Sequence, residues 1–267
     1  MKNIMIITLA TISLIALMMA SQSDAAVTPK DAVALWLLEE GAGDKVKDTS
    51  ENKNDAVITG NAKWVNGKFG KGLQIGQQMK IGAATANGVS KTYLSECLWV
   101  TFENFTTENQ FGYINAPGGA STRYFYFSTW CAAGPPHNCI HLGTLDTGGA
   151  WGRGIVTNAL FDKNKWYHVC GVINNKDGKT RAYVDGKQVH EQAFAPGDTP
   201  GKPIEIWVGG TPENYQWIQG TIDEVAFFNV ALTDDDINSL MKNGLGKAFS
   251  VEPSDKLATT WGGIKSK

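Results

Sequence analysis

The segment 166–194 limits the possible folds more than any other part of the sequence. It reads WYHVCGVINNKDGKTRAYVDGKQVHEQAF, in which three runs of β-forming residues are separated by Asp177-Gly178 and Asp185-Gly186. Asp-Gly readily adopts the positive φ angles that a two-residue hairpin turn needs. The sequence therefore predicts a three-stranded antiparallel meander over this segment.

Further short strands are expected on both sides of the meander. Alternating apolar residues, or short apolar runs bounded by turn residues, mark them at 32–38, 93–103, 124–130, 204–210 and 220–232. Glycine is abundant, with 30 residues in a chain of 267, and most glycines punctuate these runs. This pattern predicts an all-β fold, a two-sheet antiparallel jelly-roll sandwich.

One segment near the C-terminus has the signals of a helix. Thr233 is a suitable N-cap, three aspartates follow in the first turn, where the helix dipole favours acids, and Gly244 can end the helix. We therefore expect one short C-terminal helix, Asp234 to Asn243. Four tryptophans at or beside strands are expected to fill the core of the sandwich: Trp36, Trp99, Trp166 and Trp207.

Residues 1–25 have the layout of a secretory signal peptide. Lys2 precedes a mostly apolar run without charges from Ile4 to Ala20, and small residues lead to a cleavage site after Ala25. An uncleaved membrane anchor is the rival interpretation, although the run is short for a bilayer span. The expected organisation is a domain over 26–248 and a C-terminal tail over 249–267. We expect it to be secreted, periplasmic or on the cell surface, without a membrane span after cleavage.

All four cysteines follow the predicted signal peptide, and an even number in an exported chain indicates disulfides. Cys131 and Cys139 flank a Gly-Pro-Pro loop and are natural partners. Cys97 and Cys170 would then pair between strands, with two buried free thiols as the alternative. Zinc is a weaker interpretation, because the sequence has no CxxC pair and its four histidines are scattered.

The charge pattern offers no electrostatic basis for nucleic-acid binding. The chain has 24 basic and 26 acidic residues, a formal net charge of −2, and no cluster of Lys and Arg. The expected partners are therefore of another class.

Five segments between about residues 30 and 245 resemble, in this order, a known family. They read ALWLLEEGAGDKVKDTSENKNDAVITG, KWVNGKFGKGLQI, LSECLWV, KWYHVCGVINNKDGKTRAYVDGKQV and GTIDEVAFFNVALTDDDINSLMKNG. Together they resemble the laminin-G-like, concanavalin A-like jelly-roll family of exported bacterial proteins. The resemblance implies two stacked antiparallel sheets, one concave, and a role in adhesion or in binding carbohydrate or matrix protein. Segment 130–151 is longer than the family's usual loop and looks like an insertion.

Many members of this family carry calcium, and the loop DTSENKND offers oxygen ligands at Asp48, Ser50, Asn52 and Asn54. The resemblance implies an ion held between this loop and the strand that bears Asp223. The loop is not an EF-hand, because the turn glycine and the closing glutamate of that motif are missing. The alternative is an Asx-turn loop whose side chains bond their own backbone.

Catalytic signals are weak. The sequence has no E-x-D-x-x-E run that would place paired carboxylates on one face of a strand. Adjacent strand residues such as Asp223 and Glu224 point to opposite faces, so we expect one to bond loop backbone or a metal and the other to be solvated. We expect a protein that is not an enzyme, with no catalytic residues.

Ligand binding by such a fold would use exposed aromatics, because sugar rings stack on Trp and Tyr. The candidates outside the strand cores are Trp151, Arg153, Tyr215 and Trp217. The leading expectation is a secreted, non-enzymatic binding module for carbohydrate or for a cell-surface or matrix partner, with a possible structural calcium ion. The alternatives are a divergent glycan hydrolase or lyase on the same fold, and a structural protein of envelope assembly.

Overall fold

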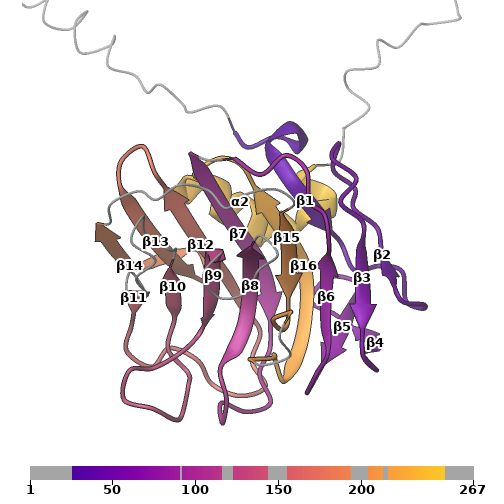
Figure 1. Cartoon of the computed structure of the whole chain (residues 1–267), viewed down its shortest axis with the longest axis horizontal. Helices are drawn as coiled ribbons and strands as arrows, with labels where there is room; N and C mark the ends of the chain where they lie inside the picture. Colours follow the sequence, from indigo (N-terminus) through magenta and orange to yellow (C-terminus); the bar gives the residue numbers. More distant parts are fainter. Residues whose placement is uncertain are drawn as a thin grey trace, which may run out of the picture.

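The computed structural model describes residues 26–90, 92–115, 123–143, 155–193, 204–212 and 216–249. These residues form two eight-stranded sheets that are antiparallel throughout and stacked on each other. Figure 1 looks through the stack, so that strands of one sheet overlap strands of the other. The prediction of a two-sheet antiparallel sandwich is confirmed.

The first sheet has the strand order β14-β13-β12-β7-β16-β5-β4, and β1 also pairs with β16. Its strands are β1 (Ala32–Trp36), β4 (Lys63–Asn66), β5 (Lys71–Ile75), β7 (Tyr93–Val100), β12 (Tyr167–Asn174), β13 (Lys179–Val184), β14 (Lys187–Ala193) and β16 (Gly220–Phe228). Strands β12, β13 and β14 are the meander that the two Asp-Gly turns predict.

The second sheet has the order β11-β10-β9-β8-β15-β6-β3-β2. Its strands are β2 (Lys45–Val46), β3 (Ala56–Thr59), β6 (Lys80–Ala83), β8 (Asn109–Asn115), β9 (Arg123–Thr129), β10 (His141–Gly143), β11 (Ile155–Val156) and β15 (Glu205–Val208). Neighbours in this sheet are often distant in sequence, because β15 lies between β8 and β6.

Three short helices complete the described part of the chain. They are the 3-10 helix η1 (Pro29–Asp31), α2 (Asp234–Asn243) and α3 (Leu245–Ala248). Helix α2 has the predicted bounds, and the Thr233 hydroxyl accepts a hydrogen bond from Asp236 N in a capping box. Gly244 adopts a φ of 72° and separates α2 from α3, which the sequence analysis did not anticipate. Both α2 and α3 pack on the outer side of the first sheet, where Ile237, Leu240 and Leu245 contact an apolar cluster that includes the two strand cysteines Cys97 and Cys170.

Both predicted disulfides are present. Cys97 on β7 and Cys170 on β12 lie opposite each other in register and form one bridge, and Cys131 and Cys139 form the other. The bridge between strands links the meander to the centre of the first sheet.

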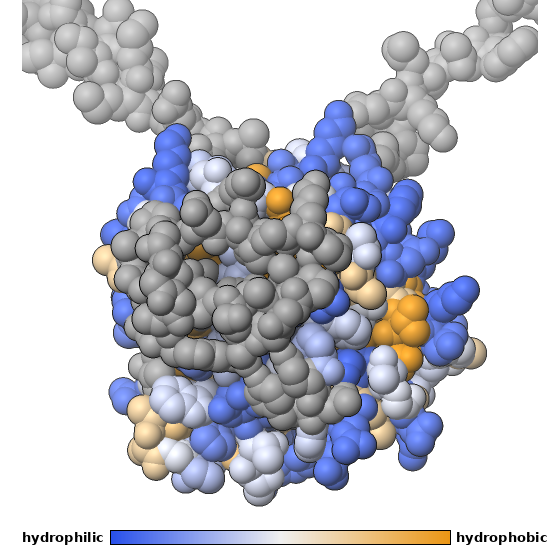
Figure 2. All heavy atoms as spheres, in the orientation of Figure 1, coloured by the Kyte–Doolittle hydropathy of each residue, from blue (hydrophilic) through white to orange (hydrophobic). Residues whose placement is uncertain are grey.

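The space between the sheets is filled by alternate side chains of the facing strands. Trp36 is fully buried there and makes an edge-on contact with Phe227, with ring centroids 5.9 Å apart. At the surface, large apolar side chains are scarce in the described ranges, and Val57 is the one that is clearly exposed, at 50%. Figure 2 accordingly shows a mainly hydrophilic exterior with small separate apolar spots.

One carboxyl group lies inside this apolar layer. Glu96 on β7 has 0% exposure, and neither oxygen has a hydrogen-bond partner within the described residues. It points at Gly112 on β8 of the facing sheet, where a Cβ would lie 1.8 Å from Oε2. Burial raises the pKa of Glu96 well above its ordinary value, so the group is held in the neutral form.

Because Glu96 is buried in its neutral form, we expect it to make the unfolding free energy depend on pH. Its folded pKa is raised, so the unfolded chain releases the proton above about pH 4.5 while the native state retains it. Stability is therefore lost as pH rises from that value towards the folded pKa, by up to about 1.4 kcal/mol per pH unit. Glu96→Gln removes this dependence. We expect the difference in unfolding free energy between Glu96→Gln and wild type to grow in favour of the variant from pH 4.5 to pH 8.

Urea denaturation at several pH values measures this difference. The other buried ionisable groups are common to both proteins and cancel in the comparison. A difference that stays constant across the pH range would contradict the assignment of a buried neutral carboxyl.

Candidate functional site

The outer side of the second sheet carries a row of aromatic side chains. Tyr126 on β9, Tyr113 on β8 and Trp207 on β15 lie opposite one another in successive strands, and Gly82 on β6 follows Trp207. Their sequence neighbours, such as Phe127, belong to the core between the sheets. Because side chains alternate along a strand, the row lies on the opposite, outer face.

Trp207 is held flat against the sheet at one end of this row. A Cβ on Gly82 would lie 2.1 Å from Trp207 Cε3, so the indole occupies the space above a residue that has no side chain. The indole Nε1 donates to Glu205 Oε2 at 3.1 Å, and Lys80 Nζ lies 5.4 Å from the ring centroid. The prediction that Trp207 belongs to the core is wrong. It is half-buried on the outer face, because Ile206 and Val208 take the inward positions of β15.

A carboxylate joins the other end of the row to the chain before β16. Glu108 Oε2 accepts hydrogen bonds from Tyr126 Oη and from Gln216 Nε2, each at 2.6 Å. Glu108 comes immediately before β8, and Gln216 is in the loop before β16. These bonds fix the directions of the phenol and of the amide on the outer face.

His141 and Trp130 extend the aromatic surface beyond Tyr126. The His141 ring lies 4.8 Å from the Tyr126 ring and 5.0 Å from the Trp130 ring, measured between centroids. Burial lowers the pKa of His141 to about 4, so the imidazole is neutral at physiological pH. Trp130 and His141 are half-buried, whereas Tyr126 is 5% exposed.

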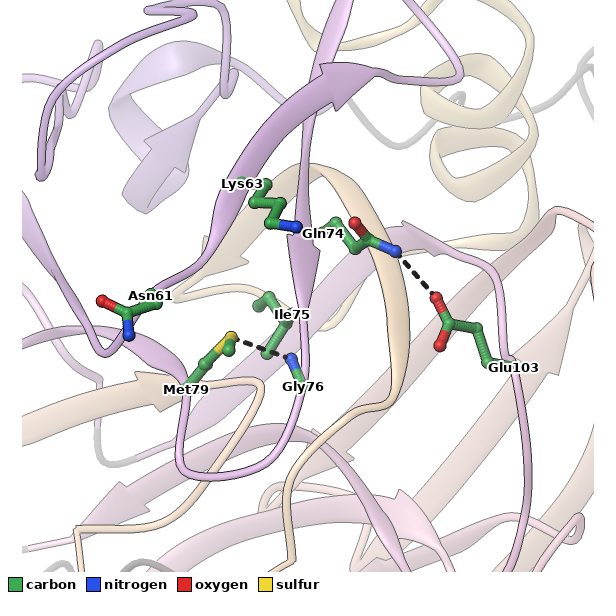
Figure 3. A pocket seen from close by; sticks show the side chains of 7 residues that line it. All are labelled: Asn61, Lys63, Gln74, Ile75, Gly76, Met79 and Glu103. Atoms are coloured by element: carbon green, nitrogen blue, oxygen red, sulfur yellow. Dashed lines mark hydrogen bonds between the residues drawn. The ribbon is translucent and has the colours of Figure 1, made fainter.

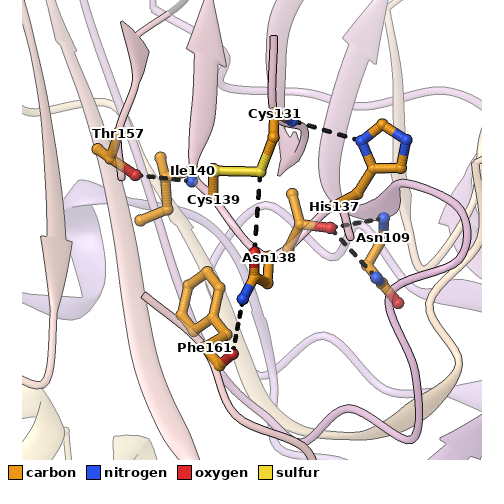
Figure 4. The surroundings of a disulfide bond; sticks show 9 residues. Asn109, Cys131, His137, Asn138, Cys139, Ile140, Thr157 and Phe161 are labelled. Carbon is orange, nitrogen blue, oxygen red and sulfur yellow. Dashed lines mark hydrogen bonds between the residues drawn. A yellow bond between two sulfur atoms is a disulfide. The ribbon is translucent and has the colours of Figure 1, made fainter. Parts of the chain in front are cut away.

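The Cys131–Cys139 disulfide explains how this pair of rings is placed. Trp130 precedes the first cysteine, and His141 follows the second by two residues, so the bridge closes the loop between them. Figure 4 shows the loop anchored from within: His137 Nδ1 accepts from Cys131 N at 3.4 Å, and Asn138 Nδ2 donates to the Phe161 carbonyl at 3.2 Å. The insertion predicted at 130–151 thus contributes, in its described part, to the outer face.

The predicted ligand-binding residues are only partly placed by the structure. Trp151, Arg153 and Tyr215 lie outside the described residues. Trp217 is half-buried and adjoins Gln216, the partner of Glu108. Tyr126, His141 and Trp207 were not predicted as outer-face residues from the sequence. The alternation in YFYFST and EIWV was the signal that places Tyr126 and Trp207 opposite the core positions.

The residues predicted to hold calcium lie in two places. Both oxygens of Asp48 are occupied: Oδ1 accepts from Leu35 N and Ser50 N, and Oδ2 accepts from Ser50 Oγ and Asn54 N, all within 2.8 Å. Asn54 Oδ1 accepts from Asn87 N, and its amide nitrogen donates to two carbonyls.

These bonds are those of an Asx-turn loop that is satisfied by its own backbone. The amide of Asn52 donates to the Ala32 carbonyl, and Asp223 bonds a different turn. As placed, the four residues do not fit one shared ion site. Calcium binding itself stays a prediction.

Asp223 and Glu224 lie at a β-bulge on β16, where Glu224 has a φ of 52°. Asp223 Oδ2 accepts from Phe69 N at 2.8 Å, and Glu224 accepts from Leu245 N at the start of α3. The expectation that one of the two is solvated is wrong, because their exposures are 0% and 6%. Burial, and secondarily the charge of Glu224, raise the pKa of Asp223 to about 8. Both carboxyls serve to hold neighbouring segments.

Two other places in the described chain lack the features of a ligand or metal site. A cavity of about 170 Å³ at the β4–β5 edge of the first sheet is lined by Asn61, Lys63, Gln74, Ile75, Gly76, Met79 and Glu103 (Figure 3). This is small beside the 300–1,000 Å³ of usual ligand pockets, and Gln74 already bonds Glu103 at 2.8 Å. Among the described residues, Cys97, His168 and Cys170 cluster as metal ligands would, but their sulfurs form a disulfide.

The strand order and the stacking of two antiparallel sheets define a jelly-roll sandwich. A family model described as the concanavalin A-like lectin/glucanases superfamily matches residues 75–238, and the chain belongs to this family. The predicted resemblance is confirmed. No curated protein matches the sequence significantly.

Solved structures with this fold are similar at low sequence identity. Domain 4 of an extracellular GH43 arabinanase from Geobacillus stearothermophilus, solved in complex with arabinotriose, has a TM-score of 0.58 and 18% identity, with 79% of this chain and 98% of that chain covered. The receptor-binding domain of botulinum neurotoxin mosaic serotype C/D has a TM-score of 0.60 and 16% identity, with 82% and 52% covered. The binding domain of Paraclostridial Mosquitocidal Protein 1 has a TM-score of 0.59 and 16% identity, with 80% and 52% covered. The chain thus spans about half the length of these two toxin domains.

Across the described ranges, the helices are too short or too polar for one of them to span a bilayer.

Gly82→Ala should disturb the outer face directly. The added methyl would lie 2.1 Å from Trp207 Cε3, so the indole has to move and lose its bond to Glu205. We expect a loss of about 1–3 kcal/mol in unfolding free energy and an altered tryptophan emission spectrum. Gly76→Ala is the control, because its Cβ would meet only Met79 at 3.8 Å. Equal stability of the two variants would contradict the described packing of Trp207.

Asp48→Ala should lower the melting temperature equally in calcium and in chelator. Removing the carboxylate leaves the donors of Leu35, Ser50 and Asn54 without their acceptor inside the protein, at a cost of about 2–4 kcal/mol. Thermal melts of wild type and variant in CaCl2 and in EDTA test this. A loss that appears only in calcium would show that an ion depends on Asp48.

Proposed function

We propose that the chain is a non-catalytic carbohydrate-binding module of an exported protein, and that it binds glycans on the outer face of its second sheet. The observation that carries this proposal is that Trp207, His141 and Trp130 are only half-buried on this face, at the two ends of the row that contains the buried Tyr126 and Tyr113, with Glu108 beside them. Aromatic rings beside oriented polar groups are what sugar recognition needs, because sugars present apolar C–H faces and hydroxyls.

The comparisons support carbohydrate as the class of ligand. The family includes lectins, and the structurally similar arabinanase domain was solved with arabinotriose. The two toxin domains are receptor-binding or binding domains by description. Export is supported by the signal-peptide pattern at 1–25 and by two disulfides, which persist in oxidising compartments.

The proposal of binding without catalysis rests on how the acidic groups are used. Asp223 and Glu224 bond backbone amides, and Glu108 accepts from Tyr126 and Gln216. Each of these carboxyls is thus already engaged by donors of the chain itself, as structural acidic residues are.

A glycan array followed by calorimetry tests this function. We expect saturable binding without release of reducing sugar, and about a tenfold loss of affinity in Trp130→Ala, the size of one aromatic contact. Trp64→Ala is the matched control, since Trp64 is also half-buried but lies on β4 of the first sheet. Product release would indicate a glycan hydrolase or lyase instead. Absence of binding to every glycan would favour a role in envelope assembly.

A further inference from the structure

The two disulfides, called the strand bridge (Cys97–Cys170) and the loop bridge (Cys131–Cys139) below, differ in how much of the protein covers them. Cys97 and Cys170 are 1% and 0% exposed, and they belong to the apolar cluster on which helix α2 packs. Cys131 and Cys139 are 7% and 6% exposed, and most of residues 132–136 in the loop that they close are exposed. A thiol in solution therefore reaches the sulfurs of the loop bridge more easily than those of the strand bridge.

The C-terminal side of the loop is fixed without the loop bridge. His141 lies on β10, which pairs with β9 and β11. Ile140 is 0% exposed in the core, and its backbone N donates to Thr157 Oγ1 at 3.0 Å. The Asn138 carbonyl accepts from Phe161 N at 3.3 Å, and Asn138 Nδ2 donates to the Phe161 carbonyl at 3.2 Å. This side of the loop therefore keeps its place when the loop bridge is open.

The N-terminal side of the loop depends on the loop bridge. Strand β9 ends one residue before Trp130, so Trp130 and Cys131 lie outside the strand. Within the described residues, the backbone bonds of Cys131 go to its own loop: its N donates to His137 Nδ1 at 3.4 Å, and its carbonyl accepts from Gly134 N at 2.9 Å. The bond to His137 is long for an N–H donor. The loop bridge is therefore the main link between Trp130 and the fixed side of the loop.

The side that depends on the bridge carries a ring of the proposed binding face. The half-buried Trp130 ring lies 5.0 Å from the His141 ring, measured between centroids. Trp130 adjoins Cys131, and His141 follows Cys139 by two residues, so the bridge keeps the two rings in contact. Opening the bridge gives the loop many more conformations, because the closed ring no longer restricts the chain.

We propose that the loop bridge is a redox-sensitive positioning element for Trp130. A dithiol reductant opens it before the strand bridge, Trp130 leaves the ring of His141, and glycan binding on the outer face weakens. The last step rests on the proposed carbohydrate-binding function, whereas the first two steps do not.

The opening reaction is thiol–disulfide exchange. A thiolate of the reductant attacks one sulfur of the loop bridge, forms a mixed disulfide and releases the other sulfur as a thiolate. The second thiolate of the reductant then displaces the remaining protein sulfur, and the reductant becomes a disulfide. The two protein sulfurs gain two electrons and take up the two protons that the dithiol has lost, so Cys131 and Cys139 end as thiols.

Timed alkylation measures the order in which the bridges open. The folded mature protein is treated with dithiothreitol, samples are quenched with iodoacetamide, and peptide mapping follows each cysteine. We expect Cys131 and Cys139 to be labelled about tenfold faster than Cys97 and Cys170, because the strand bridge lies under α2. Equal rates, or earlier labelling of the strand bridge, would overturn the proposal.

NMR signals of the indole N–H groups measure the release of Trp130. The variant Trp130→Phe identifies the signal of this residue. When the loop bridge is opened, we expect the Trp130 signal to shift and that of Trp36, which is fully buried in the core, to stay in place. An unchanged Trp130 signal would overturn the proposal. So would a shift of the Trp36 signal, since opening the bridge would then change the whole fold.

Affinities show whether the bridge acts through Trp130. Cys131→Ser/Cys139→Ser should bind the array glycan of highest affinity about tenfold more weakly than wild type, as Trp130→Ala does. In the Trp130→Ala background, the same two changes should alter the affinity by less than about twofold, because both effects have one cause. Ala133→Ser, at an exposed position of the same loop, is the matched control and should bind as wild type does.

Thermal melts confirm that the variants are folded, and wild type with its opened loop bridge alkylated is a second sample that contains no substitution. Full affinity of both samples beside a loss in Trp130→Ala would overturn the control of binding and leave the carbohydrate-binding function standing. Absence of binding to every glycan would overturn the proposed function and the control of binding with it. The alkylation rates and indole signals decide in either case whether the loop bridge positions Trp130.

Discussion

The stacking of two sheets on a shared apolar layer is the constraint on which the rest of the structure depends. It assigns every strand residue to the inside or the outside, so that Phe127 on β9 faces the core and its neighbours Tyr126 and Ser128 face outward. The layer also holds an ionisable group, Glu96, whose carboxyl lies against Gly112. The outer face of the second sheet is thus a consequence of core packing, and a shift of one residue in any strand would destroy it.

A second constraint comes from the two buried carboxyls on β16 of the first sheet. At the bulge on β16 the chain departs from simple alternation, and Asp223 and Glu224 reach the backbone amides of Phe69 and Leu245. These bonds tie the β4–β5 turn and helix α3 to the central strands. The opposite end of the chain is tied to the same region, since Val27 N donates to Asp236 Oδ1 on α2. The segments that the sequence separates most are therefore joined by carboxylates.

Local sequence signals predicted the local structure well. The two Asp-Gly turns, the Thr233 cap and both cysteine pairs were sufficient to predict the meander, helix α2 and the disulfides, because each depends on a few neighbouring residues or on one pairing choice. The outer face was not predicted. Its arrangement arises from the register of β10, β9, β8, β15 and β6, in which β15 is distant in sequence from both of its neighbours, β8 and β6. Trp207 was misassigned although the alternation in EIWV sets it opposite Ile206 and Val208; only the strand register shows that Gly82 lies beneath its indole.

Glycan binding and glycan hydrolysis make different demands on the acidic residues of a protein. A glycosidase needs a carboxylic acid that can give up its proton beside a second carboxylate. Asp223 has a raised pKa, but its hydrogen bond to Phe69 N holds it within the turn at β16, on the first sheet. Glu108 lies on the aromatic face, but two donors hold it as an acceptor. The carboxyl whose pKa is raised and the aromatic face thus lie on different sheets, and the glycan recognition proposed above does not need the two to meet.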